Sequence, residues 1–163
     1  GSSAFGAQVA AYFGLPYAFA WIFTDGHGGK EAIEIYREHY KPSNRHETPN
    51  PAICVWALAA ETHEEAQFHF SSRARWQLYR DRGLHLSFET PEVSMEQDYN
   101  EYEQAKIEEL RKKTFVGTGE EVAERISKLS KQLNVEEVAI VTWAHSDEAR
   151  RNSYSEIAKA FDM

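Results

Sequence analysis

The fold is decided by the stretch AICVWALAA, residues 52–60. Every position in it is apolar, so no polar side chain marks a solvent-facing side, and this pattern predicts a strand that is buried on both faces. Thr62 and Glu65 follow at the spacing of a helix capping box. A helix is therefore expected directly after the strand, and its buried face would consist of Ala66, Phe70, Ala74 and Leu78.

Two further strands of the same kind are predicted, one on each side of this stretch. They are the apolar runs of residues 17–23 and 138–143. Helices are expected before, between and after the strands, and the last one covers residues 146–161. The apolar faces of the others would consist of Phe5, Val9 and Tyr12, of Ile33, Tyr36 and Tyr40, and of Val122, Ile126, Leu129 and Leu133.

Residues 81–113 interrupt this alternation as a helical excursion. Its first part, residues 83–99, is predicted to be irregular, and residues 101–113 form a charged helix with Glu and Lys four positions apart. Thr118 and Glu121 then repeat the capping-box pattern before the next helix. Residues 81–99 of the excursion would be either a lid over a site or a peripheral helical insertion.

Strands that alternate with helices predict parallel pairing through right-handed crossovers, and hence an α/β fold. Burial of the strands on both faces leaves a doubly wound sheet or a βα-barrel. Three strands are convincing, and a fourth would have to end just before Gly1. Three to four strands make up about half of a (β/α)8 barrel, which needs about 250 residues. Since the chain also begins with Gly1 rather than Met, we expect one domain over residues 1–163 that is part of a longer protein or pairs with another copy.

Composition argues against several classes of function. The net charge of −8 argues against nucleic acid, whose phosphates need a basic partner surface. The apolar runs of residues 15–23 and 52–60 are nine residues each, which is less than half of the roughly twenty residues that a membrane span needs. Cys54 is the single cysteine, which fits a reducing compartment, and no signal-peptide pattern is present, so we expect a cytoplasmic location. No histidine has the spacing of a metal ligand, so no metal is expected.

Three segments carry a resemblance to a known family. Residues 1–8 (GSSAFGAQ) lead to residues 14–20 (GLPYAFA), residues 115–122 are FVGTGEEV, and residues 141–146 are VTWAHS. In this order they resemble segments of the bacterial-luciferase-like monooxygenases, over nearly the whole chain. The middle segment departs from that family's pattern because Gly119 stands in place of the usual proline. Gly-Ser-Ser also occurs in tags left by expression vectors, but the match favours natural sequence.

The resemblance implies a TIM-type barrel of which this chain supplies the C-terminal half. It implies a flavin-dependent monooxygenase that uses FMN, or alternatively a deazaflavin, reduced by a separate reductase, with oxygen and a small organic molecule as substrates. In that family the groups closest to the reacting flavin atom lie mostly in the N-terminal half, so no catalytic residue is assigned here. The chain would pair with that half or form a homo-oligomer.

The turn that opens the chain is the candidate phosphate site. A serine-rich turn at a helix N-terminus offers free amide groups and the positive end of the helix dipole, and both suit a phosphate. By resemblance, Ser3 is the best phosphate ligand, followed by Ser2 and the amides of Phe5 and Gly6. The alternative is that Ser3 is simply the N-cap of the helix.

Aromatic residues near the strand ends are further candidates. The resemblance places Trp21 against the flavin ring, where many relatives carry histidine, and an indole can lie flat on such a ring. The alternative for Trp21 is core packing. Trp143 and His145 end the last strand, and His145 would be either a flavin or substrate contact or a polar turn residue.

Two other functions stay open. A truncated, non-catalytic flavoprotein or structural subunit would complete its barrel by oligomerising. A flavin-independent sugar-phosphate enzyme would share the barrel and its phosphate loop, because a fold alone does not determine a function.

Overall fold

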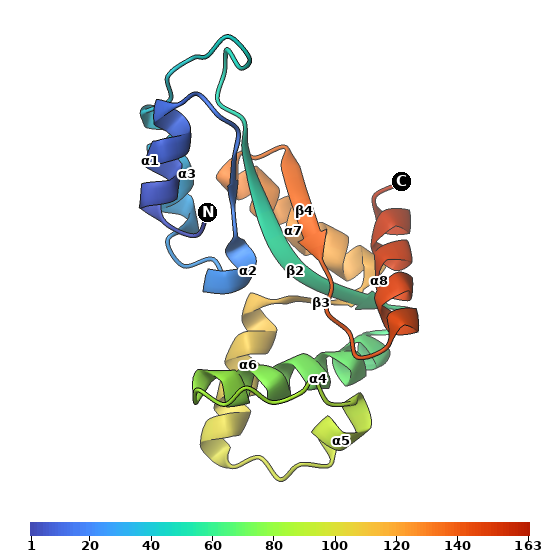
Figure 1. Ribbon diagram of the computed structural model, residues 1–163. Coiled ribbons are helices and arrows are strands. Elements are labelled where there is room, and N and C mark those ends of the chain that lie inside the picture. Colours follow the sequence, from blue (N-terminus) through green and yellow to red (C-terminus); the bar gives the residue numbers. More distant parts are fainter. The chain divides into compact units, whose positions relative to one another are not determined.

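The computed structural model describes residues 1–163 as an α/β fold in which every strand pairing is parallel (Figure 1). Contacts divide the chain into two compact units, residues 1–56 with 127–141 and residues 57–126 with 142–163. The elements in chain order are α1 (Ala4–Tyr12), β1 (Tyr17–Phe19), α2 (Trp21–Thr24), α3 (Gly29–Glu38), β2 (Pro51–Ala60), α4 (His63–Asp81), α5 (Pro91–Met95), α6 (Glu101–Lys113), β3 (Phe115–Thr118), α7 (Gly119–Leu133), β4 (Glu137–Val141) and α8 (Asp147–Ala160).

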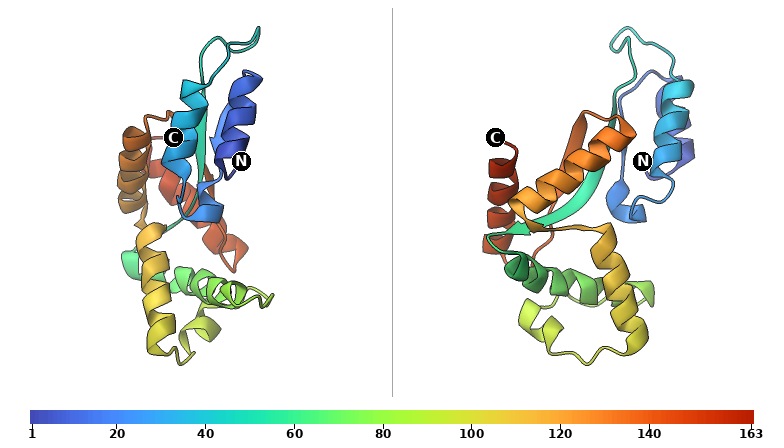
Figure 2. Two further views of the ribbon diagram at one scale, coloured as in Figure 1. Left: turned by 90° about the vertical axis from the view of Figure 1, so that its left-hand side faces the viewer. Right: turned by 180° about the vertical axis from the view of Figure 1, so that it is seen from behind.

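In the first unit, the first half of β2 lies between β1 and β4. Ala18 of β1 pairs with Ala52, and Ala139 of β4 pairs with Cys54. Helices α1 and α3 pack against each other and against β1 (Figure 2). The core of this unit consists of buried side chains that include Tyr17, Phe19, Ile33, Tyr36, Ile53 and Val55.

The other face of these strands is open, which corrects the prediction of burial on both faces. Ala18 and Ala139 are exposed, and Ala52 and Cys54 are only half-buried. Successive side chains of a strand point to opposite faces, so these four paired residues lie on one face of the sheet. The second half of β2, by contrast, is buried at every position, as predicted.

Two predictions for the N-terminal region are wrong in detail. Helix α1 buries Ala7, Ala10 and Ala11, whereas Phe5 and Tyr12 are 74% and 60% exposed. The small alanines let α1 approach its neighbours closely, and the larger predicted face stays outside. The predicted strand over residues 17–23 ends at Phe19, because the chain turns into the short helix α2 at Trp21.

In the second unit, the other half of β2 pairs with β3, from Ala57 opposite Phe115 to Ala60 opposite Thr118. The sequence patterns did not indicate β3 as a strand. Helix α4 packs against β3, α5 and α6 and buries Ala66, Phe70, Ala74 and Leu78, as predicted. The charged helix α6 has the predicted bounds. No helix of the chain is long and apolar enough to cross a membrane.

Candidate functional site

The predicted phosphate site lies at the start of α1. Ser3 is the N-cap of this helix with extended backbone (φ −152°, ψ 160°), yet its side chain accepts no capping hydrogen bond. The first bond of the helix runs from the Ala7 amide to the Ser3 carbonyl at 3.3 Å. The amides of Ala4, Phe5 and Gly6 precede that bond and therefore have no acceptor within the helix.

Ser2, Ser3 and Phe5 are exposed, and Gly6 is half-buried. A Cβ atom added at Gly6 would meet nothing closer than 3.7 Å, so the packing of this chain does not require a glycine there. The site is therefore an open turn with an unused hydroxyl and unused amides. The alternative of Ser3 as a capping side chain lacks the hydrogen bond that such a cap would make.

Backbone hydrogen bonds tie this turn to β1. The Gly1 amino group donates to the Ala18 carbonyl at 2.8 Å, and the Ala20 amide donates to the Gly1 carbonyl at 2.7 Å. These are the two bonds that a parallel ladder makes around Phe19, so Gly1 lies beside β1 as a neighbouring parallel strand would. Tyr17 also donates its hydroxyl to the Ser3 carbonyl at 3.3 Å.

Trp21 is half-buried at the start of α2 and packs on the loop that follows. A Cβ atom at Gly26 would lie 2.2 Å from the indole, and one at Gly29 would lie 2.6 Å from it. The ring of Phe19 meets the indole edge-on at 6.1 Å. Two glycines thus make room for the indole, which remains partly exposed.

Trp143 and His145 lie in the second unit. Trp143 is half-buried, meets the Trp76 ring edge-on at 5.7 Å and has the Arg73 guanidinium 5.3 Å from its ring centre. His145 is exposed. The structure therefore gives Trp143 a packing role against α4 and keeps His145 on the surface.

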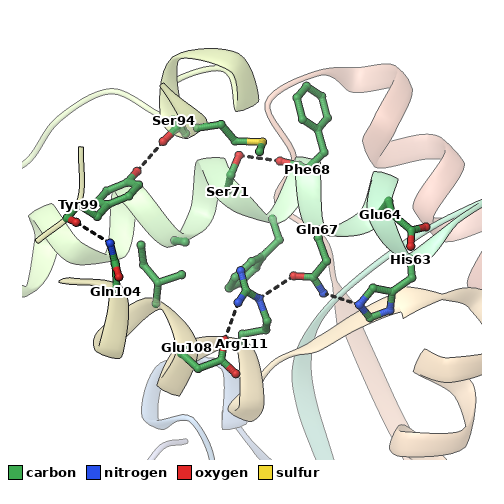
Figure 3. Close-up of a pocket in the computed structure, with 14 residues that line it drawn as sticks. His63, Glu64, Gln67, Phe68, Ser71, Ser94, Tyr99, Gln104, Glu108 and Arg111 are labelled. Carbon is green, nitrogen blue, oxygen red and sulfur yellow. Dashed lines mark hydrogen bonds and ion pairs between the residues drawn. The ribbon is translucent and has the colours of Figure 1, made fainter. Parts of the chain in front are cut away.

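The second unit also holds a pocket of about 740 Å³ between α4, α5 and α6 (Figure 3). Its lining comprises His63, Glu64, Gln67, Phe68, Phe70, Ser71, Ala74, Ser94, Met95, Tyr99, Gln104, Ile107, Glu108 and Arg111. The hydroxyl of Tyr99 donates to the Ser94 carbonyl at 2.7 Å, which ties the end of α5 to the loop before α6. None of the predicted flavin-site residues lines this pocket.

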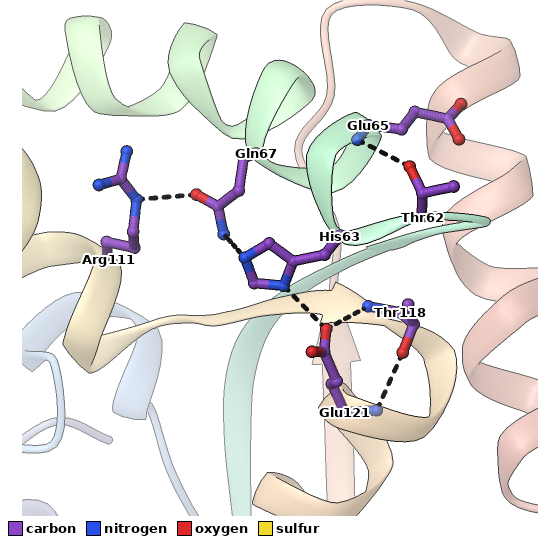
Figure 4. Close-up of polar contacts among 7 residues, drawn as sticks. All are labelled: Thr62, His63, Glu65, Gln67, Arg111, Thr118 and Glu121. Atoms are coloured by element: carbon purple, nitrogen blue, oxygen red, sulfur yellow. Dashed lines mark hydrogen bonds and ion pairs between the residues drawn. The ribbon is translucent and has the colours of Figure 1, made fainter.

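A chain of hydrogen bonds borders the pocket and continues to the start of α7 (Figure 4). His63 Nδ1 lies 3.0 Å from Glu121 Oε2, and because a carboxylate only accepts, the ring nitrogen donates. Gln67 Nε2 donates to His63 Nε2 at 3.4 Å, and Gln67 Oε1 accepts from Arg111 Nε at 2.7 Å. The chain thus runs from Arg111 through Gln67 and His63 to Glu121.

Glu121 also completes the predicted capping box of α7. Its Oε2 accepts from the Thr118 amide at 2.8 Å, and its own amide donates to Thr118 Oγ1 at 3.3 Å. The hydrogen bond from His63, followed by the one from the Thr118 amide, lowers the pKa of the Glu121 carboxyl. In the capping box of α4, one of the two hydrogen bonds forms: Thr62 Oγ1 accepts from the Glu65 amide at 3.1 Å.

The sequence patterns did not indicate the pocket. Its walls come from three helices, and residues 83–99 carry no periodic signal. The available signal was local: His63, Gln67 and Ser71 repeat at four-residue steps on one side of α4, which is more polar than its buried face.

In sequence, the chain is 35% identical over 162 residues to the uncharacterized protein YwcH of Bacillus subtilis, covering 99% of the chain and 48% of that protein. It is 29% identical over 154 residues to a luciferase-like monooxygenase of Escherichia coli, covering 94% of the chain and 46% of that protein. The chain thus spans about half the length of the relatives it matches. No family model matches it.

In structure, the chain is similar to apo-MsnO8, with a TM-score of 0.86 and 25% identity over 99% of the chain and 49% of that protein. It also shares a fold with the oxygenating constituent of 3,6-diketocamphane monooxygenase of Pseudomonas putida, a type II Baeyer–Villiger monooxygenase solved with FMN. That likeness has a TM-score of 0.57 and 15% identity, and covers 94% of the chain and 44% of the other.

Proposed function

Because this chain belongs to the luciferase-like family, we propose that it is the C-terminal half of the (β/α)8 barrel of an FMN-dependent monooxygenase. Under this proposal residues 1–163 form one domain with a helical excursion over residues 81–113. The complete enzyme would act on a small organic molecule and oxygen. The observation that carries the flavin part of the proposal is the unused hydroxyl of Ser3 beside the free amides of α1.

The open sheet face supports the barrel. Half of a closed barrel has one face covered by helices and one face turned to the barrel interior. In the first unit the covered face holds the large side chains, and the open face holds Ala18, Ala52, Cys54 and Ala139. Through its two backbone hydrogen bonds, Gly1 occupies the place that a further parallel strand would have at the free edge of β1. A strand ending at Gly1, as the sequence predicted, would continue the sheet at that edge.

The residues at the start of α1 fit a phosphate group. A phosphate monoester needs several donors and a positive environment, and the Ser3 hydroxyl, the amides of Phe5 and Gly6 and the helix N-terminus provide both. Ser2 is exposed beside them. Gly6 leaves the backbone open to close approach, although no neighbour within the chain requires it. A bound reduced flavin would supply the chemistry that activates molecular oxygen.

Trp21 would position the ring system of the flavin. Its indole is held on one side by the loop of Gly26 and Gly29, so its orientation is fixed before a ligand arrives. A fixed aromatic face loses little conformational freedom when a planar ring stacks on it. Under this proposal Trp21 orients the cofactor and excludes water from one side of it.

Titration with FMN, followed by quenching of flavin fluorescence, tests the proposal. We expect Ser3→Ala to weaken binding about tenfold, since one hydrogen bond to a charged group contributes about 1.5–3 kcal/mol. Trp21→Ala should weaken it as well. Ser155→Ala removes the same hydroxyl from an exposed position of α8 and should leave binding unchanged.

Failure of the wild-type chain to bind FMN would contradict a self-contained phosphate site. The same titration after mixing with the N-terminal half of a relative would then show whether the site needs that half. If no flavin binds in either case and the chain forms a stable oligomer, the non-catalytic structural subunit becomes the better interpretation.

A further inference from the structure

We propose that the pocket between α4, α5 and α6 binds a neutral, mainly apolar organic molecule that carries one hydrogen-bond acceptor, such as a carbonyl oxygen. This inference goes beyond the flavin site, because it concerns other residues and needs no flavin. It rests on the size of the pocket, on the unused Nη2 donor of Arg111 and on the charges at its rim.

The pocket has the size and the walls of a small-molecule site. Its volume of about 740 Å³ lies within the roughly 300–1,000 Å³ that is typical of such sites. Phe70 and Ala74 of α4 are buried in its wall, Ile107 of α6 is half-buried, and Met95 of α5 is 61% exposed at the edge. Contact with an apolar molecule would remove the exposed surfaces of Ile107 and Met95 from water.

Most polar groups of the lining already have partners within the protein. The hydroxyl of Tyr99 donates to the Ser94 carbonyl, and that of Ser71 donates to the Phe68 carbonyl at 2.6 Å. Gln104 donates to the Tyr99 carbonyl at 2.8 Å. These groups therefore shape the pocket and do not require a ligand as a hydrogen-bond partner.

Arg111 is the exception. Its Nε donates to Gln67 and its Nη1 donates to Glu108 at 2.5 Å, whereas Nη2 has no protein acceptor. Figure 3 shows the guanidinium pointing into the pocket between α4 and α6. Because a guanidinium has donors only and the Arg111 side chain is 41% exposed, Nη2 is hydrated when no ligand is bound, and an acceptor atom of a ligand would take the place of that water.

The charges at the rim select a neutral ligand. Glu64 and Glu108 carry two carboxylates on the lining against the single cation of Arg111. Because Glu108 and Arg111 form an ion pair, the carboxylate of Glu64 leaves the rim with a negative charge that repels an anion. A cation would be attracted by Glu64 but would bring no acceptor for Nη2. A neutral molecule with one acceptor oxygen avoids the repulsion and satisfies Nη2.

The test uses Nile red, a neutral dye that brightens in apolar surroundings, bound to the 163-residue chain. Butyrophenone and butylbenzene, which differ by a carbonyl group, then compete for the dye. We expect saturable dye binding and about tenfold more effective displacement by the ketone, which corresponds to one hydrogen bond to a charged donor. Equal displacement by the two compounds would overturn the proposal.

Matched variants locate the effect. Arg111→Met should abolish the preference for the ketone, and Arg111→Lys, which keeps the charge but not the fork, should reduce it. Lys112→Met removes the same charge from the next position of α6, where the side chain is 75% exposed and outside the lining, and should keep the preference. A ketone preference that survives Arg111→Met refutes the role of Nη2.

Met95→Trp provides a second, independent readout at an exposed position where folding tolerates a larger side chain. It should lower dye affinity by narrowing the pocket, with an unchanged circular dichroism spectrum. If dye binding is unaffected, the dye occupies another surface and the proposed site is wrong. Because FMN is absent throughout, these outcomes do not depend on the flavin proposal.

Discussion

Replacement of Ser153 by alanine should destabilise the second unit through one buried backbone group. Strand β4 pairs with β2 as far as Trp56 and Val141, and beyond that point β4 leaves the sheet. Beyond this point, side chains form hydrogen bonds with the backbone groups of β2 that β4 no longer pairs. Ser153 Oγ accepts from the Ala59 amide at 2.9 Å, and Thr142 Oγ1 donates to the Ala57 carbonyl at 2.8 Å.

The expected loss follows from burial. Ser153 is 0% exposed, so Ser153→Ala would leave the Ala59 amide without an acceptor and out of reach of water. An unsatisfied buried donor of this kind costs about 1–3 kcal/mol. The contact between Ser153 Oγ and Thr142 Oγ1, at 3.4 Å, is long and adds little.

Ser72 offers a matched control, because it is also 0% exposed but its hydroxyl has no hydrogen-bond partner. Ser72→Ala removes an unsatisfied buried hydroxyl, so it should be neutral or stabilising. Urea unfolding of both variants, followed by circular dichroism, measures the difference. With a slope of about 2 kcal/mol/M, a loss of about 2 kcal/mol lowers the midpoint of Ser153→Ala by about 1 M. Equal midpoints for the two variants would refute the reasoning.

Two further predictions concern the loop under Trp21 and the start of α7. Gly26 has φ +86° and Gly28 has φ +73°, but only at Gly26 would a Cβ strike the indole, whereas nothing lies within 4 Å at Gly28. Gly28→Ala should therefore cost about 1 kcal/mol of strain and Gly26→Ala about 1–3 kcal/mol more, measured by urea unfolding, and equal losses would contradict the indole contact. The pKa of Glu121 is lowered in the folded chain below its ordinary value of 4.5, so its contribution to stability is present above that value and is lost as the pH falls through the folded pKa. The stability gap between wild type and Glu121→Gln should close on acidification below about pH 4.5, and a gap that is constant between pH 3 and pH 7 would show that the carboxylate is not responsible.

Features set by short-range patterns could be predicted from the sequence. The all-apolar run of β2, the four-residue steps of α4 and the capping box of Thr118 and Glu121 each depend on neighbours within one element. The charged helix α6 falls in the same class. Packing supports these elements without overriding their local preference, so pattern and structure agree.

Features that depend on distant partners could not be predicted. Strand β3 has only four residues, and its partner on β2 lies more than fifty positions earlier. Helix α1 carries two faces at helical spacing, one of alanines and one of large apolar side chains, and only its packing against α3 shows which of them is buried. The position of the Trp21 indole likewise depends on Gly26 and Gly29, which follow it in the chain and leave room for its ring.

The candidate sites divide in the same way. The turn at Ser3 could be predicted, because its chemistry lies in consecutive residues at a helix start. The pocket of the second unit could not, because Met95 and Arg111 approach α4 from separate elements of an irregular segment. The predicted contact of Trp21 with the flavin ring stays a prediction.

The first unit has two uncovered surfaces, the exposed rings on and beside α1 and the edge of β1, and each would be covered by a different kind of partner surface. The exposed rings of Phe5 and Phe13 on and beside α1 would be buried by any apolar surface, since the hydrophobic effect has no direction. The edge of β1 beside Gly1 presents backbone hydrogen bonds in a fixed register, and only a further strand continues those. An oligomer held through α1 would therefore leave the sheet edge and the open face around Ala18 uncovered. A partner that supplies a further strand, whether an N-terminal half or a second copy, would cover the sheet edge as well, so these surfaces favour such a partner over an oligomer held through α1 alone.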